Sequence, residues 1–140
     1  MIRPHTQIII KHQDKIFVHE IKDKISQETF YRAPGGGIEF GETSLEAVNR
    51  EITEEFNTRV KNIKFLGVVE NIFEHELRKG HEIIFFYSGE FTDQKMFDEK
   101  VYKVLDSETS YAVWKPIKDF ISGKEIFYPK EAIEYLKNLL

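Results

Sequence analysis

Hydrophobic residues in the first part of the chain follow the pattern of β-strands. Residues 5–12, centred on three consecutive isoleucines, predict a buried strand, and Gln13–Asp14 predicts a turn into a second, partly alternating strand at 15–21. The charged and polar residues 22–28 indicate a loop. The two strands should therefore form a hairpin that ends in this loop.

Two longer hydrophobic runs lie in the second half of the chain. Residues 64–73 and 81–91 are rich in β-forming residues, and the polar insert 74–80 between them predicts a hairpin turn. Their near-continuous hydrophobic character indicates central strands covered on both faces. Gly67 interrupts the first run and indicates a β-bulge.

The end of the chain predicts a last strand at 111–115, a short helix at 117–121 and a terminal helix at 130–139, with Pro129 at its start. Three residues of the terminal helix should face the sheet: Ile133, Leu136 and Leu140. The order of strands, helix, strands and helix indicates an α/β fold with one mixed sheet packed between helices. A length of 140 residues suits one domain, residues 1–140.

An amphipathic helix is predicted to begin after Thr43. Thr43 as N-cap and Glu46 three residues later match a capping box, which satisfies backbone N–H groups that would otherwise be unpaired. Four hydrophobic residues should face the core: Leu45, Val48, Ile52 and Phe56. Three carboxylates gather on an adjacent stripe: Glu51, Glu54 and Glu55. Because like charges at these spacings repel, we expect a divalent cation to compensate them, and Mg²⁺ or Mn²⁺ suits carboxylate oxygens.

A glycine-rich loop precedes this helix. The glycines at 35–37 follow Pro34, and they should let the backbone take positive φ angles, approach another group closely and expose a carbonyl oxygen as a further ligand. Gly41 should allow a second turn before the helix.

The loop and the helix together resemble the Nudix box of the Nudix hydrolases. The matching positions, at the spacing of the box, are Gly36, Glu42, Arg50, Glu51, Ile52, Glu54 and Glu55. Asn57 and Thr58 depart from the pattern, because the family has glycine and an aliphatic residue there. Asparagine also tolerates the left-handed conformation that ends a helix, so the helix end should be preserved.

The resemblance implies a Nudix-type α/β/α sandwich and an Mg²⁺-dependent enzyme that cleaves the pyrophosphate bond of a nucleoside diphosphate linked to another group. It implies a set of metal ligands made of the Gly35 carbonyl, Glu51, Glu54 and Glu55. One of these carboxylates should also accept a proton from the attacking water. Arg50 and Glu42 are interpreted as an ion pair that orients the loop against the helix.

Two further groups of residues have side chains that can bind a metal. Nudix enzymes often place an acidic residue from outside the box at the metal, and the candidates here are Asp98 and Glu108. His5, His12 and His19 lie on separate parts of the first hairpin without metal-binding spacing, and they are interpreted as polar surface residues.

The composition restricts the compartment and the partners. The chain has no cysteine, which excludes disulfides and thiolate metal sites and fits a reducing cytoplasm. It has no segment typical of a signal peptide or a membrane span, so a soluble, cytoplasmic protein without a membrane partner is expected. The net charge of −4 gives no broad attraction to nucleic acid, so binding of a duplex is not expected.

The substrate and the assembly stay open on the sequence alone. ADP-ribose, nucleotide sugars, dinucleoside polyphosphates, nucleoside triphosphates and capped RNA ends share the same diphosphate, so a small-molecule nucleotide is the expected partner. A non-catalytic, nucleotide-sensing Nudix domain is the alternative, although sensing would not require all the box acids. An interaction domain with solvated helix acids is a third reading. A homodimer also stays open, because dimers are common in the family.

Overall fold

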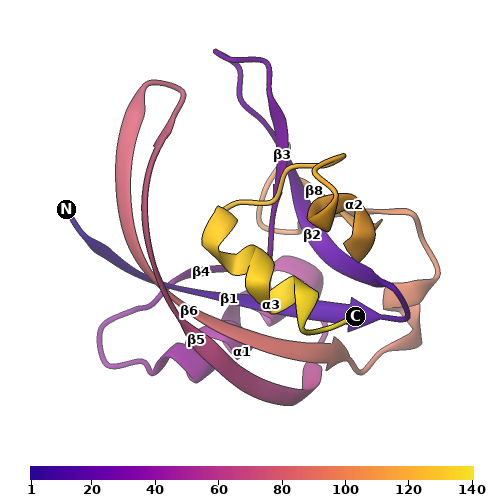
Figure 1. Cartoon of the computed structure of the whole chain (residues 1–140). Coiled ribbons are helices and arrows are strands. Elements are labelled where there is room, and N and C mark those ends of the chain that lie inside the picture. The colour runs from indigo at the N-terminus through magenta and orange to yellow at the C-terminus, as the bar shows by residue number, and fades with distance from the viewer.

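A mixed sheet forms the centre of the fold in the computed structural model, which describes all 140 residues (Figure 1). The strand order is β5-β6-β1-β2-β8-β7, with β4 paired to β1 and β3 paired to β2. The strands are β1 (Arg3–His12), β2 (Lys15–Lys22), β3 (Thr29–Arg32), β4 (Gly35–Gly37), β5 (Val60–His75), β6 (Arg78–Phe91), β7 (Val101–Lys103) and β8 (Tyr111–Pro116). The helices are α1 (Ser44–Phe56), η1 (Gln94–Phe97), α2 (Ile117–Ile121), η2 (Lys130–Ala132) and α3 (Ile133–Lys137).

The first hairpin is confirmed, and its two strands diverge beyond the turn. β1 and β2 pair only near the turn, from Ile10 opposite Phe17 to His12 opposite Lys15. The start of β1 instead pairs with β4 on one side and, in parallel, with β6 on the other. The end of β2 pairs with β3. The chain therefore brings the glycine-rich strand β4 against β1.

Two hydrophobic cores lie on opposite faces of the sheet, as the α/β/α sandwich requires. Because side chains alternate along a strand, Ile8 and Ile10 pack with α1, whereas Ile9 packs with residues of α2 and α3. Figure 1 shows α3 on the face of the sheet opposite to α1. Each fully buried isoleucine contributes about 1.5–3 kcal/mol through removal of hydrophobic surface from water.

The helix caps agree with the sequence. The side chain of Thr43 accepts from the backbone N–H of Glu46, and that of Glu46 accepts from the backbone N–H of Thr43, so the capping box is present. Asn57 ends α1 in the left-handed conformation, with φ of 50°. Leu45, however, is 42% exposed and does not join the core. It lies in the first turn of α1, and only the later members of the predicted stripe, Val48, Ile52 and Phe56, pack in the core.

The long β5–β6 ribbon differs from the prediction in two ways. Its strands continue through the polar insert, and only Glu76 and Leu77 form the turn, both with positive φ. β5 is an edge strand rather than a central one, and Ile72 is 75% exposed on it. The hydrophobic run alone did not reveal this, because a hydrophobic residue on an edge strand has the same sequence signature as a buried one. The bulge at Gly67 is confirmed by a shift in register.

The terminal helix is shorter than predicted. A 3-10 turn, η2, precedes α3, which ends at Lys137. Leu136 is fully buried and Ile133 packs against the core, but Leu140 is 63% exposed because it lies beyond the helix. None of the helices has the length and hydrophobicity that a transmembrane segment needs.

Candidate functional site

The glycine-rich strand lies directly against the acidic face of α1. Gly36 pairs with Thr6 of β1, and a Cβ added to Gly36 would lie 2.3 Å from Oε1 of Glu51. The absence of a side chain at Gly36 therefore lets β4 lie close to Glu51 of α1, and this matters more here than backbone flexibility. Among the three glycines of β4, only Gly35 has a positive φ, and the stretch predicted as a loop forms a short strand. Gly41 does turn the chain with φ of 85°.

Arg50 connects the loop to the helix through a fork of hydrogen bonds. Its Nε donates to Oε2 of Glu42 at 2.7 Å and its Nη2 to Oε1 of Glu42 at 3.0 Å. Nη2 also donates to the carbonyl oxygen of Gly37 at 2.9 Å. These contacts with Arg50 hold the pKa of Glu42 well below its ordinary value, at about 2. The geometry agrees with the predicted orienting ion pair.

Three carboxylates meet beside this fork. Oxygens of Glu51, Glu54 and Asp106 all lie within 4.8 Å of one another. A set of carboxylate oxygens without sulfur or imidazole suits a hard divalent cation such as Mg²⁺ or Mn²⁺. Glu51 is partly buried, and burial raises its pKa. Neither Asp98 nor Glu108, the candidates chosen from sequence, belongs to this group.

Glu55 takes a different position from the other two box carboxylates. Its side chain is 9% exposed and lies 3.4 Å from Nε2 of His19. Burial raises the pKa of Glu55, and the hydrogen bond from His19 opposes that shift. The backbone oxygen of Glu55 accepts the N–H of Leu105 at 2.8 Å, which brings the neighbouring Asp106 to the helix.

The interpretation of the histidines as surface residues was wrong for two of the three. The side chains of His5 and His19 are 13% and 15% exposed, and each lies near a buried glutamate, whereas His12 is exposed. The alternation of side chains along β2 could have predicted the position of His19. It lies two residues after Phe17, which packs against α1, and therefore faces the same helix.

A second charged cluster lies on the other face of β1. Nη2 of Arg32 donates to Oε1 of Glu82 at 2.8 Å, and Nε2 of His5 lies 3.7 Å from Oε2 of Glu82. Asn71 also donates to Oε1 of Glu82, at 3.4 Å. Although burial raises the pKa of Glu82, these partners outweigh it and the pKa is lowered overall. Glu82 is therefore an ionised carboxylate held inside the protein.

Acidification should destabilise the fold through His5. Burial lowers the pKa of His5 from 6.5 to about 4, although Glu82 opposes the shift. The unfolded chain therefore binds a proton in this window that the folded chain does not, and stability falls as the pH falls. We expect the free energy of unfolding to drop by about 2 kcal/mol between about pH 7 and pH 5. Urea unfolding across this range measures it. His5→Gln should weaken the dependence of the free energy of unfolding on pH, whereas His12→Gln should leave it unchanged. An equal pH dependence in the original chain and in both variants would contradict the role of His5.

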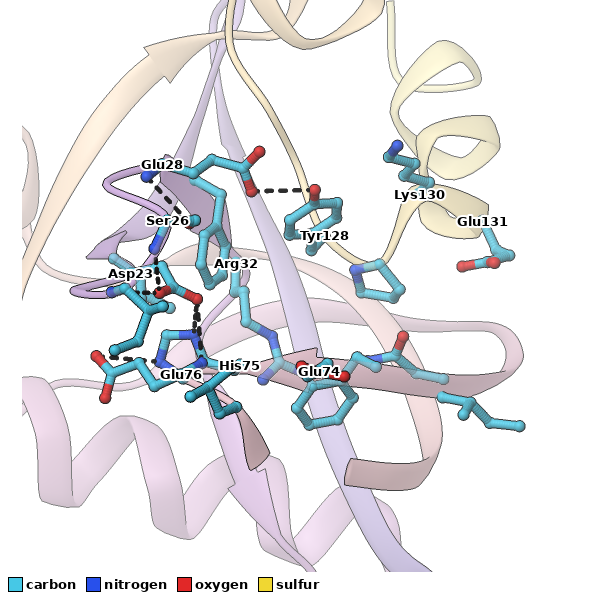
Figure 2. Close-up of a pocket in the computed structure, with 18 residues that line it drawn as sticks. Asp23, Ser26, Glu28, Arg32, Glu74, His75, Glu76, Tyr128, Lys130 and Glu131 are labelled. Carbon is cyan, nitrogen blue, oxygen red and sulfur yellow. Dashed lines mark hydrogen bonds and ion pairs between the residues drawn. The ribbon is translucent and has the colours of Figure 1, made fainter. Parts of the chain in front are cut away.

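A cavity of about 570 Å³ lies near the tip of the β5–β6 ribbon. The ribbon, the loop that follows β2 and the segment that begins η2 surround it (Figure 2). Aromatic side chains line it, namely Phe30, Phe73 and Tyr128. Tyr31, the neighbour of Phe30 in β3, belongs to the core, whereas Phe30 is buried in the cavity wall.

The chain is similar to known proteins over almost its whole length. Residues 1–138 match the family model described as NUDIX domain. An RNA pyrophosphohydrolase of Pelagibacter ubique is 25% identical over 147 aligned positions, which cover 95% of this chain and 89% of the relative. A putative mutator protein MutT4 of Mycobacterium tuberculosis is 30% identical, over 64% of this chain and 34% of the relative.

Solved structures agree on the fold. A NUDIX hydrolase from Nitrosomonas europaea superposes with a TM-score of 0.69 at 18% identity, over 99% of this chain and 88% of that one. A MutT structure from a study of Aliivibrio salmonicida and Vibrio cholerae gives 0.63 at 20% identity, over 99% of this chain and 97% of that one.

Proposed function

Because the chain belongs to the NUDIX domain family of pyrophosphohydrolases, we propose that it cleaves the pyrophosphate bond of a nucleoside diphosphate linked to another group, with Mg²⁺ or Mn²⁺ as cofactor. The observation that carries the proposal is the cluster of Glu51, Glu54 and Asp106 beside Gly36. We also propose that residues 1–140 act as a single domain.

The acidic residues have separate tasks in this proposal. Glu51, Glu54 and Asp106 hold the cation, together with the carbonyl oxygen of Gly35 that the box pattern assigns. A bound divalent cation neutralises the diphosphate oxygens and lowers the pKa of water in its coordination sphere. Glu55 is the acid we assign to accept the proton of the attacking water, because a carboxylate with a pKa raised by burial is the better base near neutral pH.

The remaining residues hold this arrangement in place. Nη1 of Arg50 donates to Oε1 of Glu51 at 2.9 Å, and the same guanidinium binds Glu42 and the Gly37 carbonyl. Arg50 therefore holds the helix and the loop at a fixed distance from each other. His19 fixes the buried carboxylate of Glu55. Such supporting contacts commonly change metal affinity or activity by about 10- to 100-fold when they are removed.

Gly36→Ala should weaken metal binding while the fold persists. The added Cβ would meet the Glu51 carboxylate at 2.3 to 2.8 Å, and a flexible side-chain end moves more easily than the backbone of β4. We expect the dissociation constant for Mn²⁺, measured by electron paramagnetic resonance, to rise roughly 10- to 100-fold. Gly37→Ala is the matched control, because Gly37 lies outside the left-handed region and an added Cβ there would make only an ordinary contact, with Nη2 of Arg3 at 3.7 Å. Equal Mn²⁺ affinity in both variants would argue against Glu51 as a ligand.

The proposal is tested by hydrolysis of a substrate panel. ADP-ribose, nucleotide sugars, dinucleoside polyphosphates, nucleoside triphosphates and 5′-triphosphorylated RNA would each be incubated with Mg²⁺ and with chelator. Cleavage of a pyrophosphate bond that chelator abolishes is the expected result. Binding of nucleotide and Mg²⁺ without cleavage of any member would favour a nucleotide-sensing domain instead.

A further inference from the structure

Asp106 is the one member of the carboxylate cluster that does not belong to α1. It lies in the turn between β7 and β8, residues 104–110, here named the β7–β8 turn. Its side chain is exposed and has no hydrogen bond or ion pair within the chain, whereas Glu51 and Glu54 both bind Arg50. Only the conformation of the backbone therefore brings the Asp106 carboxylate to the other two.

The chain just before Asp106 is anchored at two points. Val104 is 2% exposed and packs in the core with residues of α1. The backbone N–H of Leu105 donates to the carbonyl oxygen of Glu55 at 2.8 Å, but the Leu105 side chain is exposed. Apart from Val104, the turn buries little hydrophobic surface, so hydrogen bonds must set its shape.

Directly after Asp106, the hydroxyl group of Ser107 closes the turn. Its oxygen accepts the backbone N–H groups of Thr109 at 3.3 Å and Ser110 at 3.2 Å, and it donates to Oγ of Ser110 at 3.0 Å. The backbone N–H of Val104 donates to the carbonyl oxygen of Ser110 at 3.1 Å and joins the two ends of the turn. Serine favours such turns because its side chain can replace a backbone acceptor. Ser107 is thus the one side chain that binds the backbone of the β7–β8 turn.

Resting on the proposed function, we propose that Ser107 is a positioning residue of the metal site, whose hydroxyl holds the β7–β8 turn in the shape that brings Asp106 to Glu51 and Glu54. Three carboxylates with oxygens within 4.8 Å of one another repel when no cation lies between them. A turn that is free to move would relieve this repulsion, because nothing else holds the Asp106 side chain. Binding of the cation would then have to order the turn as well, and the affinity would fall.

The first test measures the dissociation constant for Mn²⁺ by electron paramagnetic resonance, without substrate. Ser107→Ala should raise it roughly tenfold, near the lower limit for loss of a supporting contact, since only one ligand is released. Ser107→Thr keeps the hydroxyl and should restore most of the affinity. An Mn²⁺ affinity in Ser107→Ala equal to that of the original chain would overturn the proposal.

Ser122→Ala is the matched control for loss of a turn hydroxyl. Oγ of Ser122 also accepts a backbone N–H two residues further on, from Lys124 at 3.3 Å. Ser122 lies at the end of α2, which packs on the other face of the sheet. Its replacement should therefore leave the dissociation constant for Mn²⁺ unchanged, and a tenfold rise there would contradict a specific role for Ser107.

A double variant shows whether Ser107 acts through Asp106. In a chain that already carries Asp106→Ala, the added Ser107→Ala should change the dissociation constant for Mn²⁺ by less than about twofold, because the ligand that it positions is gone. A further loss of roughly tenfold in that background would mean that the serine acts on the fold in general, and the proposal would be wrong.

The same measurements separate this proposal from the proposed function. Mn²⁺ binding that Ser107→Ala weakens, in a chain that hydrolyses no member of the substrate panel, would support the positioning role while the proposed function fails. Hydrolysis together with an Mn²⁺ affinity that Ser107→Ala does not change would support the proposed function and overturn the role of Ser107. An original chain that binds no Mn²⁺ would contradict both.

Discussion

Replacement of Glu54 by glutamine should lower the Mg²⁺-dependent kcat roughly 10²- to 10³-fold, equivalent to about 3–4 kcal/mol of barrier. Glu54 belongs to the carboxylate cluster, and its side chain is 48% exposed with Arg50 as its one ion-pair partner. Glutamine keeps the volume and removes the charge that a cation requires. The fold should therefore survive, with an unfolding temperature close to that of the original chain. Steady-state kinetics at several Mg²⁺ concentrations and a thermal melt measure the two effects.

Asp106→Asn should lower the Mg²⁺-dependent kcat about as much as Glu54→Gln does. Asp98→Asn and Glu108→Gln should keep a kcat close to that of the original chain. These two controls remove a carboxylate from the same acidic stretch of the chain but lie outside the cluster. If Glu108→Gln loses as much activity as Asp106→Asn, the outer ligand has been assigned to the wrong residue. If Glu54→Gln remains fully active, the metal site as a whole is misplaced.

Local signals in the sequence predicted the box and its helix well. The capping box of Thr43 and Glu46, the left-handed Asn57 and the Arg50–Glu42 pair all depend on residues close in the chain. Asp106 could not be chosen in the same way. Its place depends on a hydrogen bond between Leu105 and the backbone of Glu55, about fifty positions away, and several acids around it share its composition.

Long-range packing also explains the other differences. Hydrophobicity indicated that β5 is a strand, but its edge position is set by which strands pair, a property of the whole sheet. Glu55 and Glu54 are neighbours in one acidic run, yet one is buried beside His19 and the other exposed. Helical periodicity can predict which of two neighbouring glutamates is buried only when the strand that packs against the helix is known. Here that strand is β2, which carries His19.

Arg50→Lys should reduce both stability and activity although it keeps the positive charge. The guanidinium binds Glu42 through two nitrogens, the Gly37 carbonyl and Glu51, all within 3.0 Å. A lysine ammonium cannot reproduce this fork. We expect the free energy of unfolding to fall by about 2–3 kcal/mol, because partly buried acceptors lose their donors. Urea unfolding measures that loss, and kcat/KM should fall about 10- to 100-fold since Glu51 is no longer held.

The matched substitution Arg59→Lys separates the fork from the general effect of losing an arginine. Arg59 is exposed and its side chain has no ion pair or hydrogen bond, so its replacement should change stability by less than about 0.5 kcal/mol. Adding Glu42→Gln to Arg50→Lys should cost less than the sum of the two single changes, because both remove the same contact. Strict additivity would mean that Arg50 and Glu42 stabilise the fold independently. Arg50 would then hold the loop through Gly37 and Glu39, and Glu42 would have no part in the spacing between loop and helix.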